Sequence, residues 1–173
     1  MYDIYSKNHD DSWRYTLGKS GARKLFVIGL NPSTATKEKS DTTVAKVEGA
    51  AIRNGFDGFV MLNLYPIRAT DYSALPVEVN DEAFSENLNR IEALVSSEPH
   101  PVIWAAWGES IYARSYFVAG AKELLSRLQR HSPSWQHFGA LTRSGHPRHP
   151  SRLQYAWDFS RLDTIGYGRT LET

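Results

Sequence analysis

Two proline-containing loops carry the side chains of this chain that are best suited to chemistry. Residues 29–33 read Gly-Leu-Asn-Pro-Ser after an apolar segment, and residues 146–151 read His-Pro-Arg-His-Pro-Ser. Proline fixes its own backbone and disfavours helix at the preceding residue, so polar groups in these loops are held in place. This suits a preorganised pocket, and we expect any chemistry to lie between the two loops.

Two asparagines are candidates for orienting a ligand. The amide of Asn31 can hold a water or a ligand edge in a fixed direction, or it can satisfy its own turn. Asn63 lies inside an apolar segment, where an unmatched amide is costly to bury. Its position fits a binding role and a structural hydrogen bond equally well.

Arginines are the second group of candidates. Arg68 could contact an anion, although a surface ion pair with Asp71 explains it more simply. Arg148 has a guanidinium that can bind a phosphate or a carboxylate through two parallel hydrogen bonds. The net charge is only +1, but six arginines lie between residues 127 and 161, while residues 78–98 are acidic. This distribution fits a basic face or arginines scattered over a solvated surface.

Several familiar motifs are excluded. His146 and His149 have the spacing of metal ligands, but Pro147 makes this segment a loop and no carboxylate lies close in sequence, so ordinary hydrogen bonding is favoured. Residues 18–20 end like a phosphate-binding loop, yet Trp13 stands where that motif requires glycine. Neither a dinucleotide fingerprint nor a nucleophile elbow is present. We expect no metal and no other cofactor.

Length and composition favour one domain over residues 1–173, since 41% of the residues are hydrophobic. The chain has no cysteine, which removes disulfides and permits a reducing compartment. Its apolar runs are shorter than the ~20 residues that span a bilayer, and its first residues lack the pattern of a signal peptide. A soluble, cytoplasmic protein is predicted.

Four apolar segments of strand length predict β-strands over 24–28, 59–64, 102–107 and, more weakly, 136–141. Apolar residues at helical spacing predict three helices, over about 44–52, 84–95 and 111–129. Asp41 or Thr42 is expected to cap the first helix and Gly55 to stop it, Asn80 to cap the second, and Gly120 to interrupt the third. This alternation predicts an α/β fold, a three-layer αβα sandwich around a mostly parallel sheet of about four strands, with the site at the strands' carboxyl ends.

Four landmarks then suggest a family. In chain order they are Gly-Leu-Asn-Pro-Ser at 29–33, Met-Leu-Asn-Leu at 61–64, Ile-Trp-Ala-Ala-Trp-Gly at 103–108 and His-Pro-Ser-Arg-Leu at 149–153. This order resembles the uracil-DNA glycosylase superfamily. The resemblance implies that Asn31 positions the attacking water, that Asn63 reads the edge of the base, and that His149 meets the base carbonyl. It also implies that Leu153 wedges into the stack that the base has left.

The same resemblance assigns further roles around a flipped pyrimidine. Phe56 or Tyr65 is expected to stack on the base. Contacts to the base or substrate are expected from Pro32, Ser33, Asn63, Tyr65, Arg68, Trp107, Gly108 and Ser151. Flanking phosphates are expected to be held by Arg143, Arg148 and Arg152. A general base, where one acts, is expected to be Asp41 or Asp71.

The chain departs from the glycosylase pattern in its two motifs. Ser33 stands where the first motif ends in glycine, Arg152 stands where the second motif usually has proline, and Gln154 stands where serine is common. The chain more closely resembles a family of uncharacterised bacterial and phage proteins over about residues 13–155. The shared segments are Gly-Leu-Asn-Pro-Ser-Thr-Ala, Arg-Ala-Thr-Asp, Ala-Trp-Gly and Pro-Arg-His-Pro. That resemblance implies kinship and brings no established activity.

Together these features lead us to expect a nucleobase-recognising, N-glycosylase-like hydrolase whose partner is nucleic acid or a nucleotide, with no membrane partner. Two alternatives remain. One is a hydrolase or transferase of a free or modified nucleotide, and the other is a noncatalytic module that binds nucleic acid or modified bases. The sequence leaves the oligomeric state open.

Overall fold

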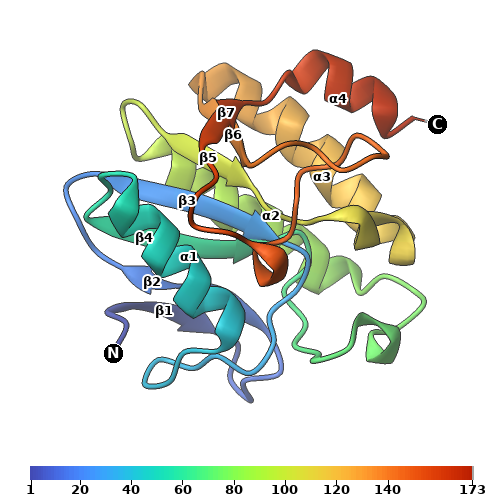
Figure 1. The fold of residues 1–173 in the computed structure, drawn as a ribbon. Helices are drawn as coiled ribbons and strands as arrows, with labels where there is room; N and C mark the ends of the chain where they lie inside the picture. Colours follow the sequence, from blue (N-terminus) through green and yellow to red (C-terminus); the bar gives the residue numbers. More distant parts are fainter. Residues whose placement is uncertain (173) are drawn as a thin grey trace.

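A seven-stranded mixed sheet forms the centre of the computed structural model, which describes residues 1–172 (Figure 1). The strand order is β1-β2-β4-β3-β5-β6-β7. In chain order the strands are β1 (Ile4–Lys7), β2 (Arg14–Lys19), β3 (Lys24–Gly29), β4 (Gly58–Asn63), β5 (Val102–Ala105), β6 (Ser134–Phe138) and β7 (Phe159–Arg161).

The four inner strands β4, β3, β5 and β6 run parallel, and the outer strands join them antiparallel. This arrangement confirms the predicted parallel core. The inner strands are continuous apolar runs, such as 24–29, because helices bury both faces of the sheet there. The prediction of about four strands was too low, since β1, β2 and β7 extend the sheet at its edges. The fourth predicted strand begins earlier, at Ser134, and ends before Gly139, whose φ of +72° breaks the pleat.

Helices cover both faces of the sheet, which makes three layers (Figure 1). Helix α1 (Thr42–Arg53) packs its buried side chains on one face. Helices α2 (Asp81–Ser96), α3 (Ser115–Leu128) and α4 (Thr164–Thr170) pack on the opposite face. The expected caps are present: Asp41 accepts a hydrogen bond from the backbone of Val44, and Asn80 accepts one from Ala83.

The third predicted helix is interrupted, but not at Gly120. A 3₁₀ helix (Glu109–Ala113) comes first, and the extended backbone of Arg114 separates it from α3. Gly120 lies inside α3, where an added Cβ would lie 3.1 Å from the carbonyl oxygen of Leu64. The glycine therefore permits close helix–sheet packing and does not break the helix.

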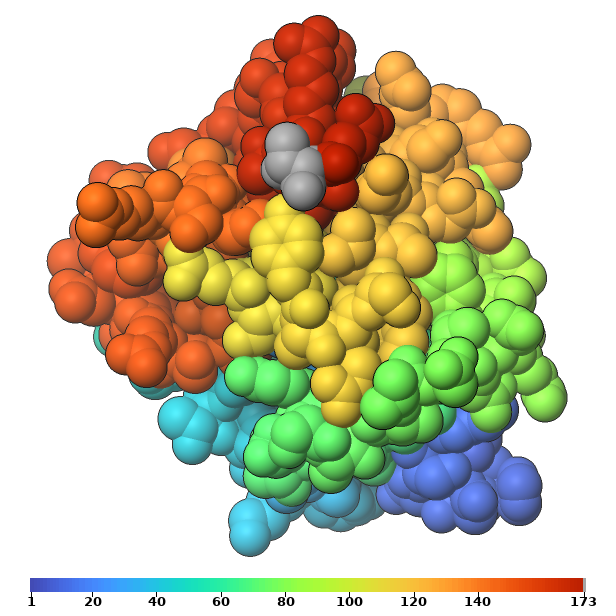
Figure 2. All heavy atoms as spheres, turned by 90° about the vertical axis from the view of Figure 1, so that its right-hand side faces the viewer, coloured from blue at the N-terminus to red at the C-terminus, as the bar shows by residue number. Residues whose placement is uncertain are grey.

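The parallel strands direct their carboxyl ends to one side of the molecule, where the predicted loops meet. The chain passes from β3 to β4 on one side and then crosses back over β3 to β5, so the crossover direction changes at the β3–β5 pair. Figure 2 shows this side, with the loops after β4 (green), β5 (yellow) and β6 (orange) next to one another. No helix among residues 1–172 is long and apolar enough to cross a membrane.

Candidate functional site

A cavity of about 720 Å³ opens at the carboxyl ends of the parallel strands. This volume is in the range of small-molecule sites. Its lining includes ten of the residues that the sequence singled out: Asn31, Ser33, Asp41, Asn63, Trp107, Gly108, Arg148, His149, Ser151 and Arg152. The loops after β3, β4, β5 and β6 thus meet around one space.

Asn63 is the most unusual member of this lining. It is the last residue of β4 and only 1% exposed, yet neither its Nδ2 nor its Oδ1 has a hydrogen-bond partner. Its backbone is fixed, because its carbonyl accepts a bond of 2.8 Å from Asn87. Gly29 leaves room for the amide, since a Cβ there would lie 3.0 Å from Asn63 Oδ1. Leaving a buried amide unpaired typically costs about 1–3 kcal/mol, so this site favours a ligand that completes the bonds.

Asn31 is held by the neighbouring loop and keeps its oxygen free. Its Nδ2 donates to the carbonyl of Ala69 at 2.9 Å and to that of Pro32 at 3.1 Å. The backbone of Ala69 in turn donates to Pro32. Since Oδ1 has no protein partner among residues 1–172, the orientation fixed by Ala69 leaves one acceptor available to a water or a ligand.

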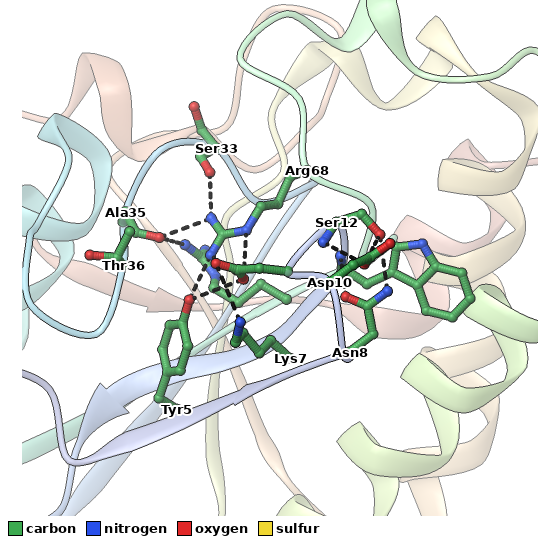
Figure 3. A network of polar contacts seen from close by, with 12 residues as sticks. Tyr5, Lys7, Asn8, Asp10, Ser12, Ser33, Ala35, Thr36 and Arg68 are labelled. Atoms are coloured by element: carbon green, nitrogen blue, oxygen red, sulfur yellow. Dashed lines mark hydrogen bonds and ion pairs between the residues drawn. The ribbon is translucent and has the colours of Figure 1, made fainter.

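Arg68 is not part of the cavity lining and instead binds the backbone of the loop that contains Ser33 and Ala35 (Figure 3). Its guanidinium donates to the carbonyls of Ser33 at 2.7 Å and Ala35 at 2.9 Å, and to the hydroxyl of Tyr5. Its ion pair is with Asp11 at 3.1 Å, not with Asp71 as the simpler interpretation of the sequence supposed. Arg68 therefore holds the backbone of residues 33–35 in place.

His149 presents a neutral imidazole to the cavity. Burial lowers its pKa to about 4, which Asp41 opposes only in part. The backbone N–H of Ser151 donates to Nδ1, so the neutral ring carries its proton on Nε2. The site therefore contains a neutral hydrogen-bond donor.

Gly108 allows the His149 loop to come this close to the end of β5. Its φ is +76°, and a Cβ on it would lie 2.9 Å from the Cβ of His149. The Ala-Trp-Gly and Pro-Arg-His-Pro segments are thus in direct contact, although about forty residues of sequence separate them.

Charged side chains also line the cavity. Arg148 is fixed by a bond of 2.7 Å from its Nε to the carbonyl of Ala140, and its guanidinium lies over the ring of Trp157. Asp41 accepts backbone N–H groups on both oxygens, from Val44 at 2.8 Å and from Ala35 at 3.3 Å.

Arg14 is a lining residue that the sequence did not indicate. It begins β2, which pairs antiparallel with β4, so its position is at the carboxyl end of the parallel strands. It is 2% exposed, and burial lowers its pKa to about 10, with Arg68 acting in the same direction. A charged residue between Trp13 and Tyr15 was the available signal, but an isolated arginine beside aromatic residues does not reveal that its strand ends at a pocket.

A comparison with known protein families identifies the family of this chain. The model of "Protein of unknown function (DUF1643)" matches residues 14–151. The chain belongs to the DUF1643 family. No curated protein and no solved structure matches it. These comparisons give no link to the uracil-DNA glycosylases.

The matched DUF1643 segment includes every residue of the cavity lining except Arg152. Other lining residues that sequence reasoning missed are Leu30, Thr43, Val44, Met61, Ala69, Thr70, Tyr72, Glu109, Ser110 and Thr142. Tyr72 supplies an aromatic ring and is 41% exposed. It follows the Arg-Ala-Thr-Asp segment directly, which was the signal that could have indicated it.

Several predicted residues of the DUF1643 chain lie away from the cavity lining. Tyr65 is fully buried, stacks on Tyr116 at 4.1 Å and accepts a bond from Asn80, and Phe56 is buried in the core on the α1 side. Neither ring is placed to stack on a ligand in this cavity. Asp71 caps a 3₁₀ turn by accepting from Ser73. Pro32 and the exposed Arg143 also lie outside the lining.

His146 is a structural residue in this DUF1643 fold. Trp107 donates from Nε1 to the hydroxyl of Tyr167 at 2.8 Å, and that hydroxyl lies 3.0 Å from Nδ1 of His146. All three side chains are buried, so this relay joins α4 to the end of β5. Among residues 1–172, no three His, Asp or Glu side chains gather in a way that could hold a metal ion.

Proposed function

We propose that this protein hydrolyses the N-glycosidic bond of a nucleotide unit whose base enters the cavity. The observation that carries the proposal is the buried and unpaired amide of Asn63. An asparagine amide offers donors and an acceptor side by side, which complements the edge of a pyrimidine. A base is therefore a ligand that removes the cost of burying this amide.

Two further lining residues, His149 and Asn31, have matching roles in this reaction. The bond from C1′ to the base breaks and its electron pair leaves with the base, which takes a proton from solvent. The oxygen of water bonds to C1′ and gives up one proton to Asp41 or to solvent. His149 stabilises the negative charge on the base, because its Nε2–H can donate to a base carbonyl without a charged ring. Asn31 Oδ1 accepts from the attacking water, and the bond from Nδ2 to Ala69 fixes its direction.

Asp41 is the general base that fits this site better than Asp71. It lines the cavity, and each of its oxygens uses one lone pair for a backbone N–H and retains another. Asp71 lies outside the lining and caps its own turn. Asn31 orients the water but cannot deprotonate it. We therefore expect turnover to be slow if Asp41 does not reach the water.

The test combines base release and stability in the variant Asn63→Leu. Single-turnover reactions use oligonucleotides that contain uracil, hypoxanthine or modified pyrimidines, and chromatography measures the free base. We expect the wild type to release one of these bases and the variant to be slower by at least about 100-fold, the size expected when a base-reading contact is lost. Because leucine removes an unpaired buried amide, the free energy of unfolding of the Asn63→Leu variant should exceed that of the wild type by about 1–3 kcal/mol.

Asn89→Leu on the exposed side of α2 is the matched control. It removes one exposed hydrogen bond from Arg127, so it should leave the rate unchanged and lower the free energy of unfolding by at most about 1 kcal/mol. Loss of activity together with loss of stability in Asn63→Leu would mean that the amide serves the fold. Release at the wild-type rate by that variant, or no release from any substrate by the wild type, rejects the proposal. Binding without release identifies a noncatalytic module.

A further inference from the structure

Arg14 is a second buried polar side chain in the cavity lining with unused hydrogen-bonding capacity. Its Nη1 donates to the carbonyl of Ala35 at 3.0 Å. Its Nε is buried and has no partner, and Nη2 has no protein acceptor among residues 1–172. The Nε–H and Nη2–H groups form the side of the guanidinium that binds two oxygens of one anion in parallel.

The fold does not need this arginine to hold the loop that it touches. Arg68 also donates to the carbonyl of Ala35, at 2.9 Å, and to that of Ser33 at 2.7 Å. The carbonyl of Ala35 therefore accepts hydrogen bonds from two guanidinium groups. Arg68 has an ion pair with Asp11, whereas Arg14 has no carboxylate within 4 Å among the residues described.

The surroundings of Arg14 favour an anion in the cavity. Two further guanidinium groups, of Arg148 and Arg152, line the same space, and the lining carboxylates are those of Asp41 and Glu109. The Asp41 oxygens accept backbone N–H groups. Glu109 bonds with Thr142 and Ser144, which lowers its pKa. Three cations thus line the cavity with two carboxylates that already have partners.

We propose that Arg14 is a binding residue for a phosphate group, and that the ligand of this cavity is a phosphorylated nucleotide unit that reaches Arg14 with its phosphate and Asn63 with its base. The assignment of the base rests on the proposed function, whereas the phosphate site stands on Arg14 alone. A phosphate completes the free side of the guanidinium and compensates a cation that burial has removed from water.

The experiment measures binding of inorganic phosphate by calorimetry to the wild type and to Arg14→Met. Methionine keeps an unbranched side chain without the charge, and Ala35 retains its bond from Arg68, so the variant should remain folded. We expect phosphate to bind the wild type and to bind the variant about 10- to 100-fold more weakly, as for loss of a charged hydrogen-bonded pair. Arg14→Lys keeps the charge without the paired N–H groups and should fall between them.

Arg161→Met is the matched control, because Arg161 is an exposed strand arginine outside the cavity lining, and its affinity should equal that of the wild type. Circular dichroism and urea unfolding verify the fold of each variant. If Arg14→Met proves unfolded, Arg14→Lys alone decides. Equal phosphate affinity in a folded Arg14 variant and the wild type, or no phosphate binding by the wild type, overturns the proposal.

A second arm identifies the source of the phosphate. The probes are 2′-deoxyuridine, its 5′-monophosphate and a short single-stranded oligonucleotide with one deoxyuridine. Tighter binding of the monophosphate than of the nucleoside supports a free nucleotide, and tighter binding of the oligonucleotide supports a nucleic-acid strand. A nucleoside that binds as tightly as both contradicts a role for phosphate. Because inorganic phosphate contains no base, its binding can succeed where base release fails, which separates this proposal from the proposed function.

Discussion

The protonation of His149 links the stability of the fold to pH. Burial keeps the ring neutral by lowering its pKa to about 4. In the unfolded chain the same imidazole has the ordinary pKa of about 6.5. As the pH falls from about 6.5 to about 4, the unfolded chain therefore takes up a proton that the folded protein refuses, and the folded state loses stability. Burial also lowers the pKa of His146, which acts in the same direction.

We predict that His149→Asn reduces this pH dependence. Asparagine offers an acceptor near the position of Nδ1 and does not titrate, so the bond from the Ser151 backbone can be kept. The wild type should lose up to about 3 kcal/mol more than the variant between pH 6.5 and pH 4. Urea unfolding at both pH values measures this difference. His9→Asn at an exposed position is the control and should follow the wild type, and equal slopes for all three proteins would contradict burial of a neutral His149.

At the scale of the elements, the cavity forms where loops contact one another, and a glycine and a backbone hydrogen bond permit these contacts. Gly108 brings the end of β5 against the His149 loop, and a hydrogen bond from Ala69 to Pro32 joins the loops after β4 and β3. These contacts connect segments that follow different strands of the parallel sheet. The geometry of the cavity thus depends on the crossing of loops more than on any one strand.

Gly108→Ala tests that dependence. The alanine would have a positive φ and a Cβ 2.9 Å from the Cβ of His149, so we predict a loss of about 1–3 kcal/mol in the free energy of unfolding. Gly168→Ala in α4 is the control, because nothing lies within 4 Å of its added Cβ, and it should leave stability unchanged or raise it by up to about 1 kcal/mol. Chemical denaturation compares the two, and a Gly108 variant as stable as the wild type would show that the loops tolerate a wider separation.

At the scale of the whole molecule, the sequence predicts the centre of the sheet better than its edges. Strands β3 and β4 are continuous apolar runs that are buried on both faces, and such runs are readable without a structure. The strands β1 and β7 are four and three residues long, and β2 mixes Arg14 with apolar residues. Helix α4 has seven residues and two glycines, so its helical propensity is low. Contacts with the rest of the fold, not local preference, define these elements.

The same reasoning explains which site residues were predictable. Asn31 follows and Asn63 ends an apolar strand, where a polar side chain has few structural uses, and His149 lies in a proline-containing loop. All three line one cavity. Arg14 and Tyr72 reach the cavity through pairing of β2 with β4 and through the path of a long loop. No local sequence pattern indicates that Arg14 and Tyr72 lie beside the cavity. The burial of Tyr65 is likewise a property of its neighbours, since Tyr116 in α3 covers its ring.

The last helix gives a test of how far the fold supports the cavity. Tyr167 in α4 is the link between Trp107 at the end of β5 and His146 in the second proline loop. Tyr167→Phe removes one oxygen and leaves both partners buried and unpaired. We predict a loss of about 2–6 kcal/mol in the free energy of unfolding, since each unpaired group costs about 1–3 kcal/mol. Urea unfolding followed by tryptophan fluorescence measures it. Tyr155→Phe, at an exposed tyrosine with no hydroxyl hydrogen bond among residues 1–172, should cost little. Equal stability of the two variants would mean that α4 is held by apolar contacts alone, and that the cavity wall does not depend on the C-terminal helix.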